Sequence, residues 1–349
     1  MNLIELLTIG IERNASDIHL TVGIPPTYRI DGELVSLIER KLTPEDTLHL
    51  IKQALNENRL RKLTEIGEID FSYSIPSVGR FRVNAFRQRG SYAMVLRIIP
   101  LGIPTMAELG LPPVVGELTK LRRGLILVTG PTGSGKTTTL ASFINKINSE
   151  RRCHIVTLEE PIEYLHRHKK SIVNQREVGS DTITFASGLR GALREDPDVI
   201  LVGEMRDLET ISTALTAAET GHLVLSTLHT NGAAKTMDRI IDVFPPFQQQ
   251  QIRVQLASVI EAVISQQLVL RASGRGRVGA FEVMLATPAI RNLIREGKIH
   301  QIETSIQTGA ALGMHTMDTS LINLYRRGLI TKEVAISQAY NIDEVRKSI

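Results

Sequence analysis

The sequence has little cysteine, few aromatic residues and little excess charge of either sign. Its one cysteine, Cys153, excludes an intramolecular disulfide and a four-cysteine zinc module. There is no Trp, and aromatic residues make up only 4% of the chain, which is poor material for stacking nucleic-acid bases. A net charge of +4 over 349 residues does not by itself indicate an acidic partner. We therefore expect no zinc and no nucleic-acid ligand.

Long apolar runs are also missing. No uninterrupted run approaches the roughly 20 residues that cross a bilayer. Residues 1–11 are apolar but include Glu5 and have no basic leader, so we expect no signal peptide. The sequence predicts a cytoplasmic protein that does not insert into a membrane, and this prediction is compatible with docking on a membrane complex.

Residues 1–99 are expected to form a small α+β domain. Apolar residues recur at helical spacing in residues 3–13 and again from Pro44 onward. An Asp31-Gly32 pair between two short alternating stretches predicts a β-hairpin. Further alternating stretches predict strands at residues 17–22, 70–75, 79–86 and 92–99. Strands and helices in this order are typical of an α+β domain.

A proline-rich stretch follows this domain. Pro100, Pro104, Pro112 and Pro113 all fall within residues 100–117, together with several glycines. Proline lacks the backbone N–H that regular structure requires, so we expect an irregular linker that acts as a hinge between two domains.

Residues 118–349 change to strands that alternate with helices, which indicates an α/β domain with a parallel sheet and right-handed crossovers. We expect core strands at residues 125–129, 154–158, 198–202 and 223–228, and helices at 185–194 and 207–219. A helix is expected from Gln248 to about Leu270, followed by a glycine-rich turn and a strand at 278–285.

The most informative stretch is a glycine-rich turn between the first core strand and the helix after it. In such a turn, glycines let backbone N–H groups surround phosphate oxygens, and the helix N-terminus favours negative charge. Lys136 supplies a positive charge for the β- and γ-phosphates, and the Thr137 hydroxyl is placed to bind Mg²⁺. The residues expected to bind the nucleotide are Gly130, Pro131, Thr132, Gly133, Ser134, Gly135, Lys136, Thr137 and Thr138.

Candidate catalytic groups follow the other core strands. Ligands bind at the carboxyl ends of strands in open α/β sheets. The second strand ends in an acidic run that includes Glu159, Glu160 and Glu163, the third is followed by Glu204, and the fourth by His229. Hydrolysis requires a carboxylate that orients or deprotonates water, and Glu163 and Glu204 are the two candidates. Taken singly, each group has a plain structural interpretation, but their coincidence on one sheet edge favours a site.

Two similar residues are placed at the wrong end of their strands. At about 3.3 Å per residue, Asp198 lies roughly 20 Å from Glu204 if the segment is extended. The same arithmetic separates His222 from His229 by roughly 23 Å. We therefore expect Asp198 to take no part in binding Mg²⁺, and His222 to serve packing or an interface.

Positive charge for the transition state has candidates in the first domain. Arg80 and Arg82 alternate with apolar residues and share one face of a strand, and Arg97 lies on the next strand. A solvated basic sheet face explains the pattern equally well.

These motifs together resemble those of the secretion ATPase superfamily, and closely those of the type IV pilus retraction ATPase (PilT) family. The resemblance covers nearly the whole chain. The matching segments begin at Ala15-Ser16-Asp17-Ile18-His19-Leu20, Arg80-Phe81-Arg82-Val83-Asn84 and Gly130–Thr137. They continue at Glu159-Glu160-Pro161-Ile162-Glu163, Gly203-Glu204-Met205-Arg206-Asp207 and Gly221–Thr230, and they end with Ala289-Ile290-Arg291-Asn292-Leu293-Ile294-Arg295-Glu296, which is similar to the retraction signature.

The resemblance implies a PAS-like domain at residues 1–99, a hinge at 100–117 and a RecA-like ATPase domain at 118–349. It implies a homohexameric motor that hydrolyses ATP with Mg²⁺, drives pilus retraction and twitching motility, and docks on an inner-membrane platform protein. Glu163 is the favoured general base, Glu204 handles Mg²⁺ with Thr137, and Arg82, Arg97 and His229 complete the catalytic set. The chain has no tetracysteine insert of the kind that pilus-extension relatives carry.

Three alternatives stay open at this point. A related ATPase could serve pilus extension, secretion or DNA uptake. A RecA-like nucleic-acid motor belongs to a different class, and single-stranded DNA would stimulate its activity. A nucleotide-sensing regulator would bind ATP without hydrolysing it.

Overall fold

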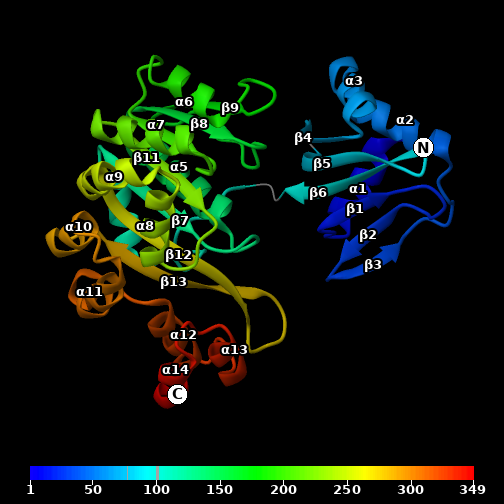
Figure 1. Ribbon diagram of the computed structural model, residues 1–349. Coiled ribbons are helices and arrows are strands. Elements are labelled where there is room, and N and C mark those ends of the chain that lie inside the picture. The colour runs from blue at the N-terminus through cyan, green and yellow to red at the C-terminus, as the bar shows by residue number, and fades with distance from the viewer. Residues whose placement is uncertain (77, 100–101) are drawn as a thin grey trace. The chain divides into compact units, whose positions relative to one another are not determined.

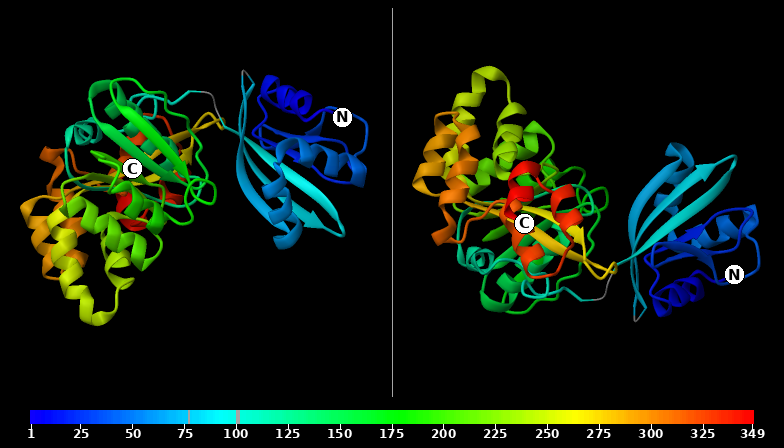
Figure 2. Two further views of the ribbon diagram at one scale, coloured as in Figure 1. Left: turned by 90° about the horizontal axis from the view of Figure 1, so that it is seen from above. Right: turned by 90° about the horizontal axis from the view of Figure 1, so that it is seen from below.

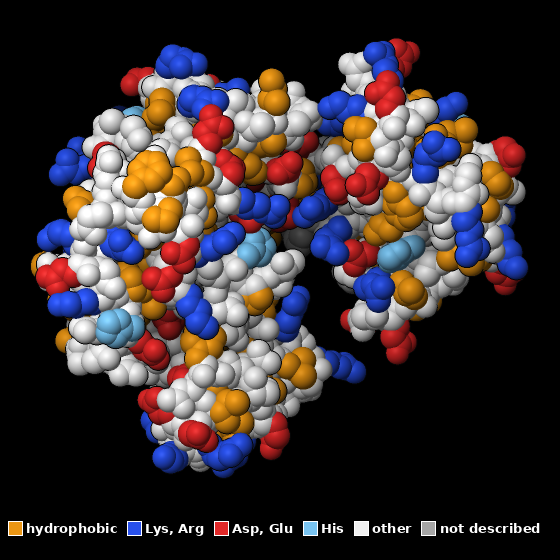
Figure 3. Space-filling model, viewed as in Figure 1, with side chains coloured by type: hydrophobic (Ala, Val, Ile, Leu, Met, Phe, Trp, Pro, Cys, Tyr) orange, Lys and Arg blue, Asp and Glu red, His pale blue; other side chains and the backbone are white. Residues whose placement is uncertain are grey.

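The computed structural model describes residues 1–76, 78–99 and 102–349, and the chain divides into two compact units (Figure 1). The first comprises Met1–Gly102 with Pro161–Leu165, and the second comprises Ile103–Glu160 with His166–Ile349. On the visible face of each unit, acidic and basic side chains are interspersed (Figure 3). No helix among the described residues is long and apolar enough to cross a membrane.

The predicted linker is only partly irregular. Pro100 and Leu101 lie outside the described residues. Pro113–Glu117 forms the short helix α4, so the expectation of irregular structure is wrong there. Proline is tolerated in the first turn of a helix, where its missing N–H has no partner to lose. Val115 in this helix is fully buried in the second unit.

In the described part of the first unit, an antiparallel sheet is accompanied by three helices, as predicted for an α+β domain. Its six strands lie in the order β3-β2-β1-β6-β5-β4. The Asp31-Gly32 turn of the β2–β3 hairpin has φ values of 50° and 89°, which explains the choice of residues. The strands are β1 (Asp17–Leu20), β2 (Thr27–Ile30), β3 (Glu33–Ser36), β4 (Glu68–Ile75), β5 (Gly79–Gln88) and β6 (Ser91–Ile99), and the helices are α1 (Leu3–Glu12), α2 (Pro44–Ala54) and α3 (Glu57–Ile66).

The second unit is built on a seven-stranded sheet in the order β13-β12-β7-β11-β10-β8-β9. All neighbouring strands are parallel except the β12–β13 hairpin. This arrangement confirms the predicted α/β class with a parallel core. The strands are β7 (Gly124–Thr129), β8 (His154–Glu159), β9 (Ile172–Glu177), β10 (Val199–Val202), β11 (Leu223–Leu228), β12 (Ile260–Leu270) and β13 (Arg277–Leu285).

Helices cover both faces of this sheet, and β7 shows why (Figures 1 and 2). Leu125 and Leu127 point to one face and pack with α7, α8 and α9, while Ile126 and Val128 point to the other and pack with α5. All six residues of β7 are buried, as expected for a strand covered on both sides. The helices are α5 (Lys136–Glu150), α6 (Phe185–Ala192), α7 (Leu208–Glu219), α8 (Ala233–Asp242), α9 (Pro246–Val259), α10 (Pro288–Arg295), α11 (Ile302–Thr308), α12 (Met317–Arg326), α13 (Lys332–Ser337) and α14 (Ile342–Ser348).

The structure differs from the sequence prediction in two elements of the sheet. The predicted helix from Gln248 to about Leu270 ends at Val259, and the rest is strand β12. Because β12 lies between β7 and β13, most of it is buried, and its apolar residues, interrupted by Glu261 and by Ser265-Gln266-Gln267, show neither period. Strand β9 was not predicted, because Ile172–Glu177 at the sheet edge is mostly polar.

Helix α10 contains the retraction-type signature segment. Thr287 accepts a hydrogen bond from the Ile290 backbone N–H and so caps the helix, as its sequence position indicates. Arg291, which the helical spacing places on the outer side, instead donates to the carbonyls of Ala257 and Ser258 at the end of α9. It also pairs with Glu261 of β12 at 2.9 Å. This arginine therefore ties α10 to α9 and β12.

Candidate active site

The glycine-rich loop lies between β7 and α5, and its glycines are required by geometry. Gly130, Gly133 and Gly135 have φ values of 141°, 76° and 90°. A Cβ on Gly130 would lie 2.2 Å from the Gln266 carbonyl oxygen, and one on Gly135 would lie 2.8 Å from Gln266 Nε2. The loop therefore lies directly against β12, and other residues would clash as well as strain the backbone.

Lys136, the first residue of α5, is buried beneath this loop. Its Nζ donates to the carbonyl oxygens of Gly130 at 2.9 Å and Pro131 at 3.0 Å. Burial lowers the pKa of this ammonium group, and the nearby negative charge of Glu204 offsets part of the shift. The lysine thus places a positive charge in a site where the protein provides few compensating charges.

The loop also holds a buried hydroxyl that has no hydrogen-bond partner. Ser134 is 2% exposed, and its Oγ contacts no donor or acceptor. Buried polar groups are nearly always paired, and this one lies in the glycine-rich loop itself, where a bound ligand can supply the missing partner. Together with the α5 N-terminus and Lys136, this hydroxyl makes the loop fit an anionic phosphate group.

Glu204 and His229 lie together beside the loop, although they come from different strands. Glu204 follows β10 by two residues, and its Oε1 lies 3.4 Å from His229 Nε2. The other ring nitrogen of His229 lies 3.4 Å from the Thr132 hydroxyl. The carboxyl ends of three strands therefore meet here.

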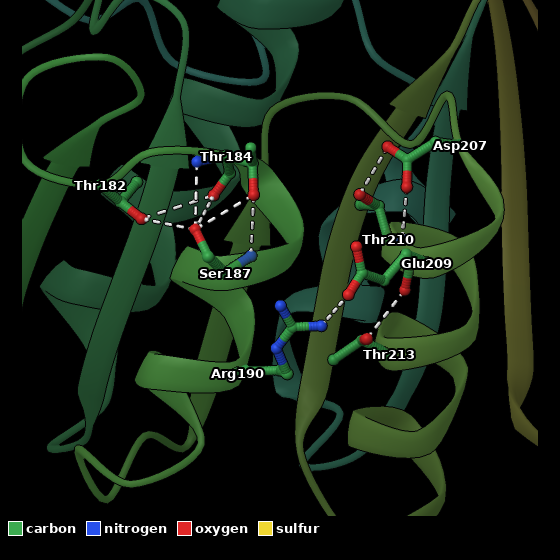
Figure 4. A network of polar contacts seen from close by, with 8 residues as sticks. All are labelled: Thr182, Thr184, Ser187, Arg190, Asp207, Glu209, Thr210 and Thr213. Carbon is green, nitrogen blue, oxygen red and sulfur yellow. Dashed lines mark hydrogen bonds and ion pairs between the residues drawn. The ribbon is translucent and has the colours of Figure 1, made fainter.

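Glu204 has a second partner that the sequence prediction missed. The exposed Arg206 side chain brings its Nε to 2.5 Å from Glu204 Oε1, and this charged hydrogen bond raises the pKa of Arg206. Asp207, the next residue, caps α7 by accepting from the Thr210 N–H and hydroxyl, each at 2.8 Å (Figure 4). Helix α7 is held in turn by an ion pair between its Glu209 and Arg190 of α6. The segment that carries Glu204 is thus anchored at its far end.

The acidic run after β8 contributes residues to both units. Glu159 is buried, and its Oε1 accepts hydrogen bonds from Thr157 at 2.7 Å and Gln175 at 3.0 Å. Glu160 is exposed. Glu163 belongs to the first unit, where Arg82 Nη1 lies 3.7 Å from its Oε1.

Two of the three candidate arginines of the first unit, Arg82 and Arg97, are direct neighbours. In the β5–β6 pairing, Arg82 lies opposite Arg97, so both side chains leave the same face of the sheet. Arg97 Nε donates to Asp17 at 2.9 Å. Burial alone would raise the pKa of Asp17, but hydrogen bonds from Ser16 and Arg97 and the charge of Arg97 outweigh it and leave this pKa lowered.

Asp198 and His222 lie at the opposite, amino-terminal end of the parallel strands. Asp198 accepts a hydrogen bond from the His154 N–H at 2.8 Å. His222 Nδ1 lies 2.9 Å from the Ala217 carbonyl at the end of α7. Both serve the local backbone.

The loop region offers two protein groups, Thr137 and Glu204, that could bind a metal ion. Thr137 is exposed and Glu204 is half-buried, and among the described residues no group of three or more His, Cys, Asp or Glu side chains is arranged to hold a metal ion. Mg²⁺ in phosphate sites uses one or two protein oxygens with phosphate and water oxygens, and Thr137 and Glu204 fit that donor set.

Two residues of β12 belong to the site, although no motif pointed to them. Ser265 Oγ lies 2.6 Å from the Thr129 hydroxyl and accepts from the Gly232 N–H at 3.1 Å. Gln266 contacts the loop and α5. The only signal in the sequence is the polar run Ser265-Gln266-Gln267 inside an apolar stretch.

A parallel sheet whose first strand leads through a phosphate loop into a helix, with an acid and a histidine on the adjoining strand ends, defines a P-loop nucleotide-binding protein. The type II/IV secretion system protein family matches residues 2–334 of the chain. The chain belongs to this family.

The relatives place the chain more narrowly. It is 50% identical over 339 residues to the type IV pilus retraction ATPase PilT of Pseudomonas aeruginosa, covering 97% of this chain and 98% of the relative. It is 40% identical to the type IV pilus ATPase PilU of the same organism, covering 100% and 91% of the two chains.

Solved structures agree. A crystal structure of the pilus retraction motor PilT with bound ADP has a TM-score of 0.93 and 52% identity, covering 99% of both chains. The ATPase DotB of Legionella pneumophila has a TM-score of 0.84 and 31% identity, covering 96% of this chain and 95% of the other.

Proposed function

We propose that this chain is a Mg²⁺-dependent ATPase that acts as a homohexameric motor and retracts type IV pili. The observation that carries the proposal is the 50% identity to a pilus retraction ATPase over almost the whole length of both proteins. The cluster of Lys136, Glu204 and His229 at the phosphate loop supports hydrolysis rather than simple nucleotide sensing.

The loop residues Gly130–Thr138 bind the triphosphate in this proposal. Backbone N–H groups and the α5 N-terminus face the phosphates, and Lys136 transfers its Nζ from the loop carbonyls to phosphate oxygens. Thr137 and Glu204 would hold Mg²⁺. When bound, Mg²⁺ would neutralise charge that develops on the phosphates.

Two acids share the work on water. Glu163 is proposed to orient or deprotonate the attacking water, and its Oε1 lies 3.7 Å from Arg82 Nη1, which helps to hold the carboxylate in place. Glu204 is proposed to handle Mg²⁺ or its water. His229 links Glu204 to Thr132 of the loop, and this position supports a role in sensing the γ-phosphate.

Arg82 and Arg97 are proposed to supply positive charge as the phosphoryl group leaves. Their cross-strand pairing supports the proposal, because it presents two guanidinium groups from one sheet face. Asp17 holds Arg97 by its Nε, so this contact does not use the two Nη groups, which the proposal assigns to the ligand.

The proposed setting is the cytoplasmic face of the inner membrane, where the ring would dock on the pilus platform protein. The proposed domains are residues 1–99 and 118–349, with a hinge at 100–117 whose opening and closing converts nucleotide binding into movement. Helix α10 carries the retraction signature, and its attachment to α9 and β12 through Arg291 supports a role in transmitting that movement.

A deletion strain scored for pilus number and twitching motility tests the proposal. We expect the deletion to abolish motility while cells keep or accumulate pili, and wild type but not Lys136→Ala to restore movement. Loss of pili altogether would contradict retraction and favour assembly or secretion, which the match to the type II/IV secretion system protein family also supports. Retraction by Lys136→Ala cells would contradict ATP-driven action at this site.

A further inference from the structure

Gln266 of β12 is a buried amide that contacts the phosphate loop and the first helix at once. It is 4% exposed. Its Nε2 donates to the Ser134 carbonyl at 2.5 Å, and its Oε1 accepts from the Thr139 hydroxyl at 2.8 Å. Ser134 lies in the loop and Thr139 in the first turns of α5, so one side chain joins both parts of the phosphate site.

The chemistry of the partners fixes which way this amide faces. A backbone carbonyl such as that of Ser134 only accepts, so the nitrogen must face it, and the oxygen is left for the Thr139 hydroxyl. A glutamate at this position would place an oxygen against the Ser134 carbonyl, and a methionine would offer no donor. Among side chains of this length, an uncharged amide satisfies both partners.

The phosphate loop packs directly against Gln266. The Gln266 carbonyl oxygen lies only 2.2 Å from the position of a Cβ on Gly130, and Gln266 Nε2 lies 2.8 Å from the Cβ position on Gly135. Two of the loop glycines are therefore demanded by contact with one residue of β12. Ser265, its neighbour, pairs with Thr129 at the end of β7 and fixes the strand beneath the loop.

From this geometry we propose that Gln266 is a positioning residue for nucleotide binding. It holds the Ser134 peptide so that the loop N–H groups already face the phosphate position before a nucleotide arrives. A loop that is pre-organised in this way loses less conformational freedom when it binds, and the gain is in affinity. The inference rests on the proposed ATPase function and adds the residue that prepares its phosphate loop.

The test compares Gln266→Met, which keeps the length of the side chain but removes both hydrogen bonds, with the wild-type full chain. The Kd of fluorescent N-methylanthraniloyl-ADP is measured with Mg²⁺, and the KM and kcat for ATP are measured alongside. We expect the Kd and KM to rise about 10- to 100-fold, since a buried carbonyl and hydroxyl lose their partners. The kcat at saturating ATP should stay within about threefold.

Three further variants separate positioning from general stability. Thr139→Val leaves the Ser134 bond intact, so its Kd should rise less than that of Gln266→Met. Gln266→Glu should bind at least as weakly as Gln266→Met, because it cannot donate to Ser134. Ser142→Ala removes a buried hydroxyl of the same helix that has no partner, and it should leave Kd and KM unchanged.

The outcomes are distinct. A Gln266→Met protein that melts at a lower temperature but binds the ADP probe within twofold of wild type would overturn the inference and leave a structural role only. A wild-type chain that neither binds the probe nor hydrolyses ATP would overturn the proposed function itself.

Discussion

The two ends of the parallel sheet in the second unit use the same residue types for different purposes. Strand β10 has Asp198 before its amino end and Glu204 beyond its carboxyl end, and β11 has His222 and His229 in the matching positions. At the amino end, both side chains are hydrogen-bonded to nearby backbone. At the carboxyl end, the acid and the histidine face each other beside the phosphate loop.

This difference follows from topology rather than from the residues themselves. In a parallel sheet with crossover helices, the N-terminus of each following helix lies near the carboxyl end of its strand, where unpaired N–H groups favour anions. A carboxylate is stabilised there, and Glu204 in addition pairs with Arg206 and lies near Lys136. The comparison teaches that position on the sheet decides which acid or histidine is available for chemistry.

The largest expected effect comes from removing the buried cation at the carboxyl end. Lys136→Ala should lower ATP turnover by at least about 1,000-fold, because the phosphates lose their charged partner. Steady-state phosphate release measures this. Lys146→Ala, which removes a half-buried lysine of the same helix that pairs with Glu150, should stay within about twofold of wild type. Similar losses of ATP turnover in Lys136→Ala and Lys146→Ala would contradict the special role of the carboxyl end of the sheet.

The second largest effect is expected from the two acids that flank β10, because only Glu204 lies at the phosphate loop. Glu204→Gln keeps the shape but removes the charge, and we expect kcat to fall about 100-fold. Asp198→Asn makes the same change on the same strand, yet an amide oxygen still accepts from the His154 N–H. Its kcat should stay within about twofold, as ATP hydrolysis assays on the two purified variants would show. An equal fall in the kcat of Asp198→Asn would contradict the assignment of the active site to the carboxyl end of the sheet.

His229 and His222, which flank β11, should differ in their effect on kcat by a smaller factor. His229→Gln should lower kcat by about tenfold, because the contacts of His229 with Thr132 of the loop and with Glu204 are lost. His222→Gln should leave kcat unchanged and cost about 1 kcal/mol of stability, because it disturbs the end of α7. Urea unfolding, measured beside turnover, tests both statements. A catalytic loss in His222→Gln would count against the account.

A final effect, on stability rather than on turnover, concerns a third histidine, which belongs to neither strand end. Burial, with the charge of Lys169, lowers the pKa of His166 to about 4. The unfolded chain therefore binds a proton below about pH 6.5 that the folded chain does not bind until about pH 4. Stability should be constant above that window and fall by about 2 kcal/mol across it as pH decreases.

Urea unfolding at a series of pH values measures this, and His166→Gln should flatten the profile between pH 6.5 and 4. If the variant retains the full pH dependence of the wild type, other groups are responsible for the acid sensitivity.

Much of the site was predictable because its residues stand at fixed distances from recognisable strands. Lys136, Glu204 and His229 each follow a buried apolar run, and parallel strands bring such positions to one edge. The strand arithmetic also placed Asp198 and His222 at the far end, as the structure has them.

The rest could not be read from the sequence, for physical reasons. Residues 248–270 form a continuous stretch without Gly or Pro, and nothing local shows that a buried strand starts at Ile260. Gln266 contacts the loop because it lies on that strand. A prediction that residues 260–270 are helical therefore cannot anticipate the contact. Helical periodicity predicts that Arg291 lies on the outer face of α10. It does not reveal that the end of α9 packs beside this arginine and accepts its hydrogen bond.

A crystal structure of this chain with Mg²⁺ and a slowly hydrolysed ATP analogue tests the central claim most directly. The account predicts that the phosphates contact the N–H groups of residues 133–137, and that Lys136 Nζ leaves the Gly130 and Pro131 carbonyls for a phosphate oxygen. Phosphates bound elsewhere on the second unit, with Lys136 still held by those carbonyls, would contradict it.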